Sequence, residues 1–226
     1  KQHMVTNGNL NMINNIEKIL PLLKFENNSQ CQILILKRKK DFKDKSINNQ
    51  KEDVRLIKDY YFKSKEELLD RFEEIQHLSE ITKSRVYVNL NLKDISTIGL
   101  KMIKIISENL LNKSFKFKSI YRQAFIECST IKPKKFIVDV DEKEGRNENI
   151  LYEELIKTIY HCDPVGNKIL ANIETPNGYH LITSAFNTEQ FNTNQNICYE
   201  VDVKKDMQPT VLFVPTSLCK NNKINE

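Results

Sequence analysis

The stretch Phe136-Ile137-Val138-Asp139-Val140-Asp141 joins an apolar run to two carboxylates one residue apart. Successive side chains of a strand point to opposite faces, so Asp139 and Asp141 share one face and the two valines take the other. Two acids at the end of a buried strand are typical of a site for a divalent cation. Because Mg²⁺ and Mn²⁺ take oxygen ligands and leave positions open for substrate phosphates, we expect one of these ions here.

The size and composition of the chain are those of an ordinary globular protein. It has 226 residues, 39% of them hydrophobic and 29% charged, enough for one large domain or two subdomains that share a core. It has no apolar run of about 18 residues, so we expect no membrane span. Its five cysteines are widely spaced and contain no C-x-x-C pair. This usage argues against a disulfide framework or a zinc knuckle and favours the cytoplasm.

Charge is divided unevenly along the chain. Residues 1–135 carry 27 Lys and Arg against 16 Asp and Glu, a balance of +11. Residues 136–226 carry 8 against 14, a balance of −6. A basic half beside an acidic half suits a protein that binds a polyanion with one and metal ions with the other, although solvated surface lysines would give the same totals.

The second half alternates strands and helices. The turn Thr175-Pro176-Asn177-Gly178 predicts a tight hairpin, because Pro followed by Asn-Gly is strong turn chemistry. Around it the sequence predicts strands over 136–141, 168–173, 179–183, 197–203 and 211–214, and helices over 150–160 and 188–193. We therefore predict an α+β fold with a mixed sheet of the RNA-recognition type, with helices on one face and a cleft on the other.

The first half predicts an α/β subdomain packed against that core. Its expected strands cover 31–36, 54–62 and 85–92, and its expected helices cover 14–23, 64–81, 96–111 and 115–128. Ser64 to Glu67 fits a capping box at the start of the second helix. The predicted division is 13–134 for this subdomain and 135–215 for the catalytic core. Residues 1–12, disordered or of artificial origin, and a disordered 216–226 flank them.

Basic and amide side chains give candidates for nucleic-acid contact. They are Lys37, Arg38, Lys39 and Lys40 after a predicted strand, and Lys116, Lys118 and Arg122 on a predicted helix near Tyr121. A solvated loop and an ordinary amphipathic helix are the alternative interpretations. Asn89 and Asn91, on the polar face of the strand over 85–92, are further candidates for the cleft.

Further polar residues in predicted strands complete a constellation with the two acids. His180 begins the strand after the turn, and Asp202 lies within a later strand. Three carboxylates around two cations can activate a 3′-hydroxyl and stabilise a leaving pyrophosphate. A histidine with Gly178 two residues earlier can hold a triphosphate oxygen. If the strand register differs, Glu200 or Asp206 replaces Asp202.

In this order the residues resemble the three motifs of the archaeo-eukaryotic primase superfamily, the primase-polymerases. The first motif of the family is an apolar strand ending in Asp-x-Asp, and residues 136–141 are similar to it. The second is a small residue, any residue and then His, which resembles Gly178-Tyr179-His180. The third is an apolar residue followed by Asp, which resembles Val201-Asp202. The family usually has Ser where this chain has Gly178. Small phage and plasmid proteins with the pattern F-I-V-D-x-D … P-x-x-G-x-H-L-I-T are also similar.

The resemblance implies an enzyme that uses two Mg²⁺ or Mn²⁺ ions to add nucleotides to a 3′-hydroxyl on a DNA template. It implies that Asp139, Asp141 and Asp202 bind the metal ions, and that His180 and Gly178 bind the nucleotide. The implied partners are single-stranded or primed DNA, nucleoside triphosphates, and a replication helicase or initiator protein, in a virus- or plasmid-encoded system.

Two other functions fit the same residues. One is a non-catalytic nucleic-acid-binding replication module with the same fold. The other is a metal-dependent nuclease, which uses the same acids with water in place of a 3′-hydroxyl.

Overall fold

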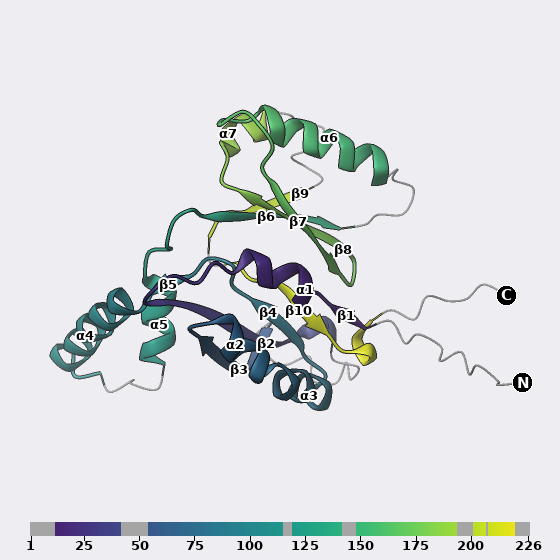
Figure 1. Ribbon diagram of the computed structural model, residues 1–226. Coiled ribbons are helices and arrows are strands. Elements are labelled where there is room, and N and C mark those ends of the chain that lie inside the picture. Colours follow the sequence, from purple (N-terminus) through teal and green to yellow (C-terminus); the bar gives the residue numbers. More distant parts are fainter. Residues whose placement is uncertain are drawn as a thin grey trace, which may run out of the picture.

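The computed structural model describes residues 12–41, 54–114, 119–141, 148–193, 201–206 and 208–219. Within these residues the chain has an α+β fold with two antiparallel β-sheets, and Figure 1 shows one sheet lying over the other. None of the described helices is long and apolar enough to cross a membrane.

The first sheet has the strand order β1-β10-β4-β2-β3, with β5 paired to the start of β2. Its longest strands form an antiparallel pair in which Cys31 lies opposite Phe62 and Arg38 opposite Val54. The strands are β1 (Ile13–Asn14), β2 (Ser29–Arg38), β3 (Val54–Phe62), β4 (Arg85–Val88), β5 (Lys93–Asp94) and β10 (Thr210–Val214).

The second sheet has the strand order β7-β8-β6-β9. Along the chain its elements are β6 (Lys135–Asp141), α6 (Glu148–His161), β7 (Ile169–Thr175), β8 (Gly178–Ser184), α7 (Thr188–Asn192) and β9 (Val201–Lys204). The prediction of a mixed sheet was wrong, because every described pair of neighbouring strands is antiparallel. Strands joined by a helix are not neighbours here: β8 lies between β6 and β7, and β6 lies between β8 and β9.

Strand β6 contributes to two cores because its side chains alternate. Val138 and Val140 are fully buried with Leu155 of α6, in the core between the second sheet and its helices. Ile137 points the other way and belongs to the core that the two sheets share. Asp139 lies on the same face as Ile137, so its carboxylate projects toward the first sheet.

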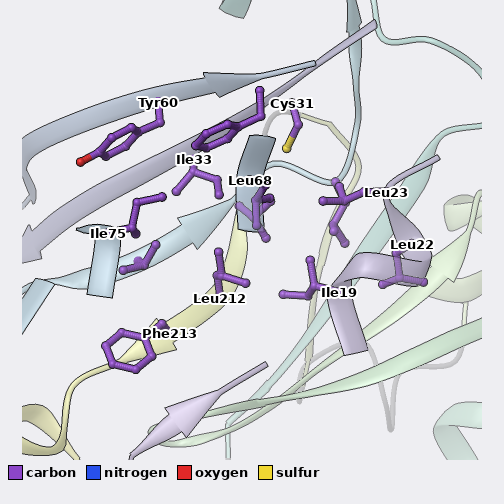
Figure 2. Close-up of a cluster of buried hydrophobic side chains, with 14 of the residues drawn as sticks. Ile19, Leu22, Leu23, Cys31, Ile33, Tyr60, Leu68, Ile75, Leu212 and Phe213 are labelled. Atoms are coloured by element: carbon purple, nitrogen blue, oxygen red, sulfur yellow. The ribbon is translucent and has the colours of Figure 1, made fainter. Parts of the chain in front are cut away.

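The shared core holds the two sheets together beside that carboxylate. It also includes residues of α1 (Ile16–Ile19), the 3₁₀ turn η1 (Leu20–Leu22), α2 (Lys65–Asp70) and α3 (Phe72–Thr82). Figure 2 shows Ile33 of β2, Ile75 of α3 and Leu212 of β10 among its side chains. Burial of each such side chain stabilises the fold by roughly 1.5–3 kcal/mol.

Helix α2 begins as the sequence predicts. Ser64 Oγ accepts a hydrogen bond from the backbone N–H of Glu67 at 3.2 Å, and Glu67 Oε2 accepts one from the backbone N–H of Lys63 at 2.7 Å. The single helix predicted over 64–81 is divided at Arg71, which has a φ of −103° and a ψ of 0° and lies between the end of α2 and the start of α3.

Strand β4 ends at Val88, before the end of the strand predicted over 85–92. Asn91 replaces strand pairing there: its Oδ1 accepts from the backbone N–H of Lys135 at 2.8 Å, and its Nδ2 donates to the Lys135 carbonyl at 2.9 Å. Asn91 and Asn89 are both buried. Asn91 joins the chain after β4 to β6, and Asn89 Oδ1 accepts from the backbone N–H of Asn91 at 3.2 Å. Neither asparagine lines the cleft described below, so the prediction that they face it was wrong.

The chain returns to the first sheet at its end. The strand predicted over 211–214 forms as β10, but it pairs with β1 and β4, so the predicted segment 135–215 contributes strands to both sheets. Beyond the other end of the first sheet, α4 (Ile95–Leu111) and α5 (Ile120–Glu127) pack on each other (Figure 1). The start of the helix predicted over 115–128, and the termini 1–11 and 220–226, lie outside the described residues.

Candidate functional site

A cleft of about 260 Å³ lies between the two sheets at the end of β6 that carries the acids. The second sheet and its hairpin contribute Asp139, Asp141, Thr175, Pro176, Asn177, His180 and Lys204. The first sheet and the chain beside it contribute Leu36, Arg38, Val54, Arg85, Tyr87, Gln208, Pro209 and Val211. One wall therefore carries two of the predicted acids, Asp139 and Asp141, with His180, and the other wall carries arginines.

Three polar side chains form a row across the second sheet. Asp139 of β6 lies directly opposite His180 of β8 on one side and Asp202 of β9 on the other. Because opposed residues of antiparallel strands share a face, all three project toward the first sheet. Asp141 shares that face two residues along β6 and lies opposite Gly178. The strand register thus brings the acids and histidine of the three motifs together.

Asp139 is bonded by two side chains. Its Oδ1 lies 3.2 Å from His180 Nε2, and its Oδ2 forms a short ion pair with Lys204 Nζ. Burial acts to raise the pKa of Asp139, but the hydrogen bond and charge of His180, followed by those of Lys204, hold the pKa well below its usual range. Asp139 is therefore an ionised carboxylate that is already paired with the ammonium group of Lys204.

His180 connects the two sheets. Its Nδ1 lies 2.8 Å from Oγ1 of Thr210 in β10, and its Nε2 faces Asp139. His180 is 7% exposed and Thr210 is fully buried. Because both ring nitrogens are engaged, the ring is fixed in orientation with Nε2 at the cleft.

The hairpin strand that carries His180, β8, begins at Gly178. Gly178 has a φ of 152°, in a region that residues with a Cβ rarely adopt, and it lies opposite Thr175 of β7. The two turn residues, Pro176 and Asn177, line the cleft. The predicted Pro-Asn-Gly hairpin is confirmed, and it places the backbone of the turn beside the acids.

The first-sheet wall contains a fixed arginine and an exposed one. Arg85 binds Asp41 of the 3₁₀ turn η2 (Lys39–Asp41) at 2.6 Å through Nη2 and 3.0 Å through Nε. Their side chains are only 6% and 3% exposed. Arg38, at the end of β2, is exposed and lines the same cleft. Guanidinium groups facing a cleft suit an anionic ligand such as a phosphate.

Tyr87 provides a second indication of a polar ligand. It lines the cleft and is 7% exposed. Its hydroxyl has no hydrogen-bond partner among the residues that the structure describes. A buried hydroxyl without a partner costs roughly 1–3 kcal/mol, so a ligand that bonds it in the cleft gains affinity.

Two of the cations predicted to contact DNA form bonds within the protein. Lys37 Nζ donates to the carbonyl of Thr82 at 3.0 Å, at the end of α3. Arg122 Nε lies 2.7 Å from Asp59 Oδ2, a contact between α5 and β3. Both side chains join elements of the first-sheet half, and neither lines the cleft.

The remaining predicted cations are one exposed lysine and three whose side chains are not described. Lys39 is exposed in η2, next to Arg38. The side chain of Lys40 and all of Lys116 and Lys118 lie outside the described residues. Arg38 and Lys39 are therefore the predicted cations that the structure places at or beside the cleft.

The candidates for the third carboxylate differ in position. Asp202 is exposed and lies opposite Asp139 in the sheet register, although it is not among the residues that line the cleft. Asp206 accepts hydrogen bonds from Thr130 Oγ1 and Lys134 Nζ, each at 2.8 Å, and does not line the cleft. Glu200 lies outside the described residues. The register therefore favours Asp202.

The carboxylate oxygens of Asp139, Asp141 and Asp202 are the type of ligand atom that Mg²⁺ and Mn²⁺ prefer. In the described ranges, no three Asp, Glu, His or Cys side chains already lie close enough to surround one ion. Instead, the ammonium group of Lys204 binds the carboxylate of Asp139. A metal ion at Asp139 would therefore take the place of Lys204.

Comparisons of the chain with models of protein families, with curated proteins and with solved structures found no match.

Four residues of the candidate site were not singled out from the sequence: Lys204, Arg85 and Tyr87, which line the cleft, and Thr210, which bonds His180 behind it. For Lys204 a signal was available, because it follows Asp202 by two positions in one strand and so shares its face. For Thr210 there was none, because its contact with His180 depends on how the two sheets lie against each other.

Proposed function

We propose that the protein is a metal-dependent nucleotidyltransferase of the primase-polymerase type, which adds nucleotides to a 3′-hydroxyl on a DNA template. The observation that carries the proposal is the row of Asp139, His180 and Asp202 on neighbouring strands, with Asp141 beside it. These residues come from the three motifs whose order resembles the archaeo-eukaryotic primases. Asp139, Asp141 and His180 line a cleft whose other wall carries Arg38 and Arg85.

The topology of the second sheet supports an RNA-recognition-like core. Its elements run β-α-β-β-α-β, and its first and third strands, β6 and β8, occupy the centre of the sheet. This is the split β-α-β arrangement of ferredoxin-like folds. In the proposal, these two central strands carry the catalytic acids and the histidine, and the first sheet forms the opposite wall.

In the proposed reaction, Asp139, Asp141 and Asp202 hold Mg²⁺ or Mn²⁺. When bound, such ions favour ionisation of the 3′-hydroxyl and stabilise the charge of the leaving pyrophosphate. His180 donates from Nε2 to a phosphate oxygen, and Gly178 leaves space for that phosphate beside the ring. The Thr210 bond keeps the ring aimed at the cleft while Nε2 changes partner.

The first-sheet wall binds the other anions in this proposal. Arg85, held by Asp41, presents a fixed guanidinium to a phosphate of the nucleotide or the template. Arg38 and Lys39 contact template phosphates, so their contribution decreases as salt increases. A replication helicase or initiator protein is the proposed further partner.

Primer extension with Mn²⁺ and an Asp139→Asn variant tests the proposal. Asparagine keeps the size of the side chain and removes the charge, so extension should fall by at least about a hundredfold if Asp139 binds the metal. Glu73→Gln, an exposed change on α3, is the matched control and should extend normally. Extension by Asp139→Asn at the wild-type rate would contradict the proposal, and metal-dependent shortening of the primer would favour a nuclease.

A second candidate is a non-catalytic module that binds nucleic acid with the same fold. The ion pair between Lys204 and Asp139 favours it, because a lysine on the first acid keeps the row satisfied without metal. This function predicts that single-stranded DNA binding is unchanged by EDTA and by Asp139→Asn. The two functions therefore differ in one measurement, the metal dependence of nucleotide and DNA binding.

A further inference from the structure

A second cavity, of about 170 Å³, lies at the other end of the interface between the two sheets. Strand β6 connects the two spaces, because Lys135 lines this cavity while Asp139 lines the cleft. Strand β8 also connects them, because Ser184 lines the cavity and His180 lines the cleft. The shared hydrophobic core fills the space between them.

The lining combines apolar walls with lysines. Leu22, Leu92 and Ile131 are among its apolar residues. Lys24, Lys132, Lys134 and Lys135 also line it, with Glu26 as the single carboxylate. Lys134 is paired with Asp206 at 2.8 Å, which leaves three lysines and one acid around the cavity.

Lys135 is the unusual member of this group. The residue is 9% exposed, and its Nζ lies 3.5 Å from the carbonyl of Leu90, the limit of a hydrogen bond. Within the described ranges no carboxylate lies within ion-pair distance of it. Burial raises the pKa of the neighbouring Cys31 thiol to about 12, so this thiol is neutral and supplies no counter-charge.

The other buried lysines show how this protein normally satisfies such a group. Lys93 donates to the carbonyl of Cys128 at 2.6 Å and to Thr130 Oγ1 at 3.0 Å. Lys168 donates to three carbonyls at 2.9, 3.2 and 3.0 Å. Lys135 has none of these short bonds. Burial, followed by the charge of Lys24, lowers its pKa, and a bound anion would act in the opposite direction by stabilising the charged ammonium group.

We propose that this cavity binds a small organic anion, whose carboxylate or phosphate pairs with Lys135 and Lys24 and whose apolar body packs on Leu22, Leu92 and Ile131. The buried ammonium supplies the affinity for the charge, because an ion pair that is also hydrogen-bonded compensates for burial. The apolar walls select ligands with a hydrophobic body over inorganic ions. This site is independent of the proposed nucleotidyl transfer.

Four matched probes test the proposal by NMR titration of the full chain, followed at the methyl groups of Leu92 and Ile131. Hexanoate and hexyl phosphate carry both the charge and the apolar body, 1-hexanol carries only the body, and inorganic phosphate only the charge. We expect hexanoate, hexyl phosphate or both to bind about tenfold or more tightly than 1-hexanol and inorganic phosphate. Which of the two binds more tightly identifies the head group.

Lys135→Met and Lys157→Met complete the experiment. Lys135→Met removes the charge and keeps the volume, so it should abolish the advantage of the anions over 1-hexanol while retaining the circular dichroism of the native protein. Lys157→Met, an exposed change on α6, should bind like the wild type. The proposal is overturned if inorganic phosphate binds as tightly as the hexyl anions, if none of the probes binds, or if Lys135→Met keeps the preference for anions.

Discussion

The two ends of β6 hold their buried charges in different ways. At the cleft end, Asp139 is bonded by His180 and Lys204, and Arg85 by Asp41. At the cavity end, Lys135 has one long hydrogen bond and no ion pair with a described residue. One strand therefore carries a paired charge at one end and, at the other, a charge with no counter-ion among the described residues.

The difference separates two kinds of candidate site. A paired carboxylate is stable without a ligand, and it binds one by exchanging partners, as when a metal ion replaces Lys204. An unpaired buried ammonium leaves a penalty that a ligand of opposite charge removes directly.

Breaking the most buried pair of the cleft end should cost the most stability. Asp41→Ala leaves the Arg85 guanidinium, whose side chain is 6% exposed, without its carboxylate, so the free energy of unfolding should fall by about 3–5 kcal/mol. Glu74→Ala breaks exposed ion pairs with Lys58 and Arg71, and it should cost no more than about 1 kcal/mol. Urea unfolding measures both, and equal losses would show that the buried pair is not special.

Substitution of the two buried lysines, Lys93 and Lys135, should change the free energy of unfolding by different amounts in the same assay. Lys93→Met removes the donor to Cys128 and Thr130, so it should lower the free energy of unfolding by about 1–3 kcal/mol. Lys135→Met removes a charge that lacks such partners, so stability should stay the same or increase. A loss in Lys135→Met as large as that in Lys93→Met would mean that Lys135 is satisfied in the folded protein.

Removing the internal cation at the cleft end should help a metal ion. In Lys204→Met the carboxylate of Asp139 loses its ammonium partner, so MnCl₂ should stabilise the protein more. The rise in melting temperature caused by a given MnCl₂ concentration should be about 2–4 °C larger than in the wild type. The double variant Asp139→Asn with Lys204→Met should lose this gain. An unchanged response of Lys204→Met to MnCl₂ would mean that Lys204 does not occupy the metal position.

The smallest effect concerns an exposed acid and its pH dependence. The hydrogen bond from Arg71, with those of Tyr60 and Lys58, lowers the pKa of Glu74 to about 2. A lowered folded-state pKa adds stability that is present above the unfolded value of about 4.3 and is lost as pH falls toward the folded value. Glu74→Gln should therefore lose less stability than the wild type between pH 5 and pH 2, as measured by urea unfolding at several pH values.

Local patterns in the sequence predicted much of the second sheet. The apolar run into Asp139 forms β6, and the Pro-Asn-Gly turn forms the β7–β8 hairpin, because alternation and turn chemistry depend on neighbouring residues. The sequence also placed His180 and Asp202 in strands. Their position on either side of Asp139 required the register, which local patterns do not contain.

The contacts between the sheets could not be predicted in this way. Thr210 lies in a strand that was assigned to the second half, yet it pairs in the first sheet and bonds His180 from there. Lys37 and Arg122 were predicted to contact DNA, and the structure shows that each bonds a residue far away in the sequence. Side-chain partners that come from another element are set by tertiary packing, and this is where the sequence stops being informative.

We propose that the acids of β6 bind a divalent cation together with a nucleotide. Isothermal titration calorimetry of a nucleoside triphosphate in the presence of MnCl₂, comparing the wild type with Asp139→Asn, tests it most directly. We predict binding that requires MnCl₂ in the wild type and is lost in Asp139→Asn. Binding of equal affinity in both proteins, or binding that is indifferent to MnCl₂, would contradict the account.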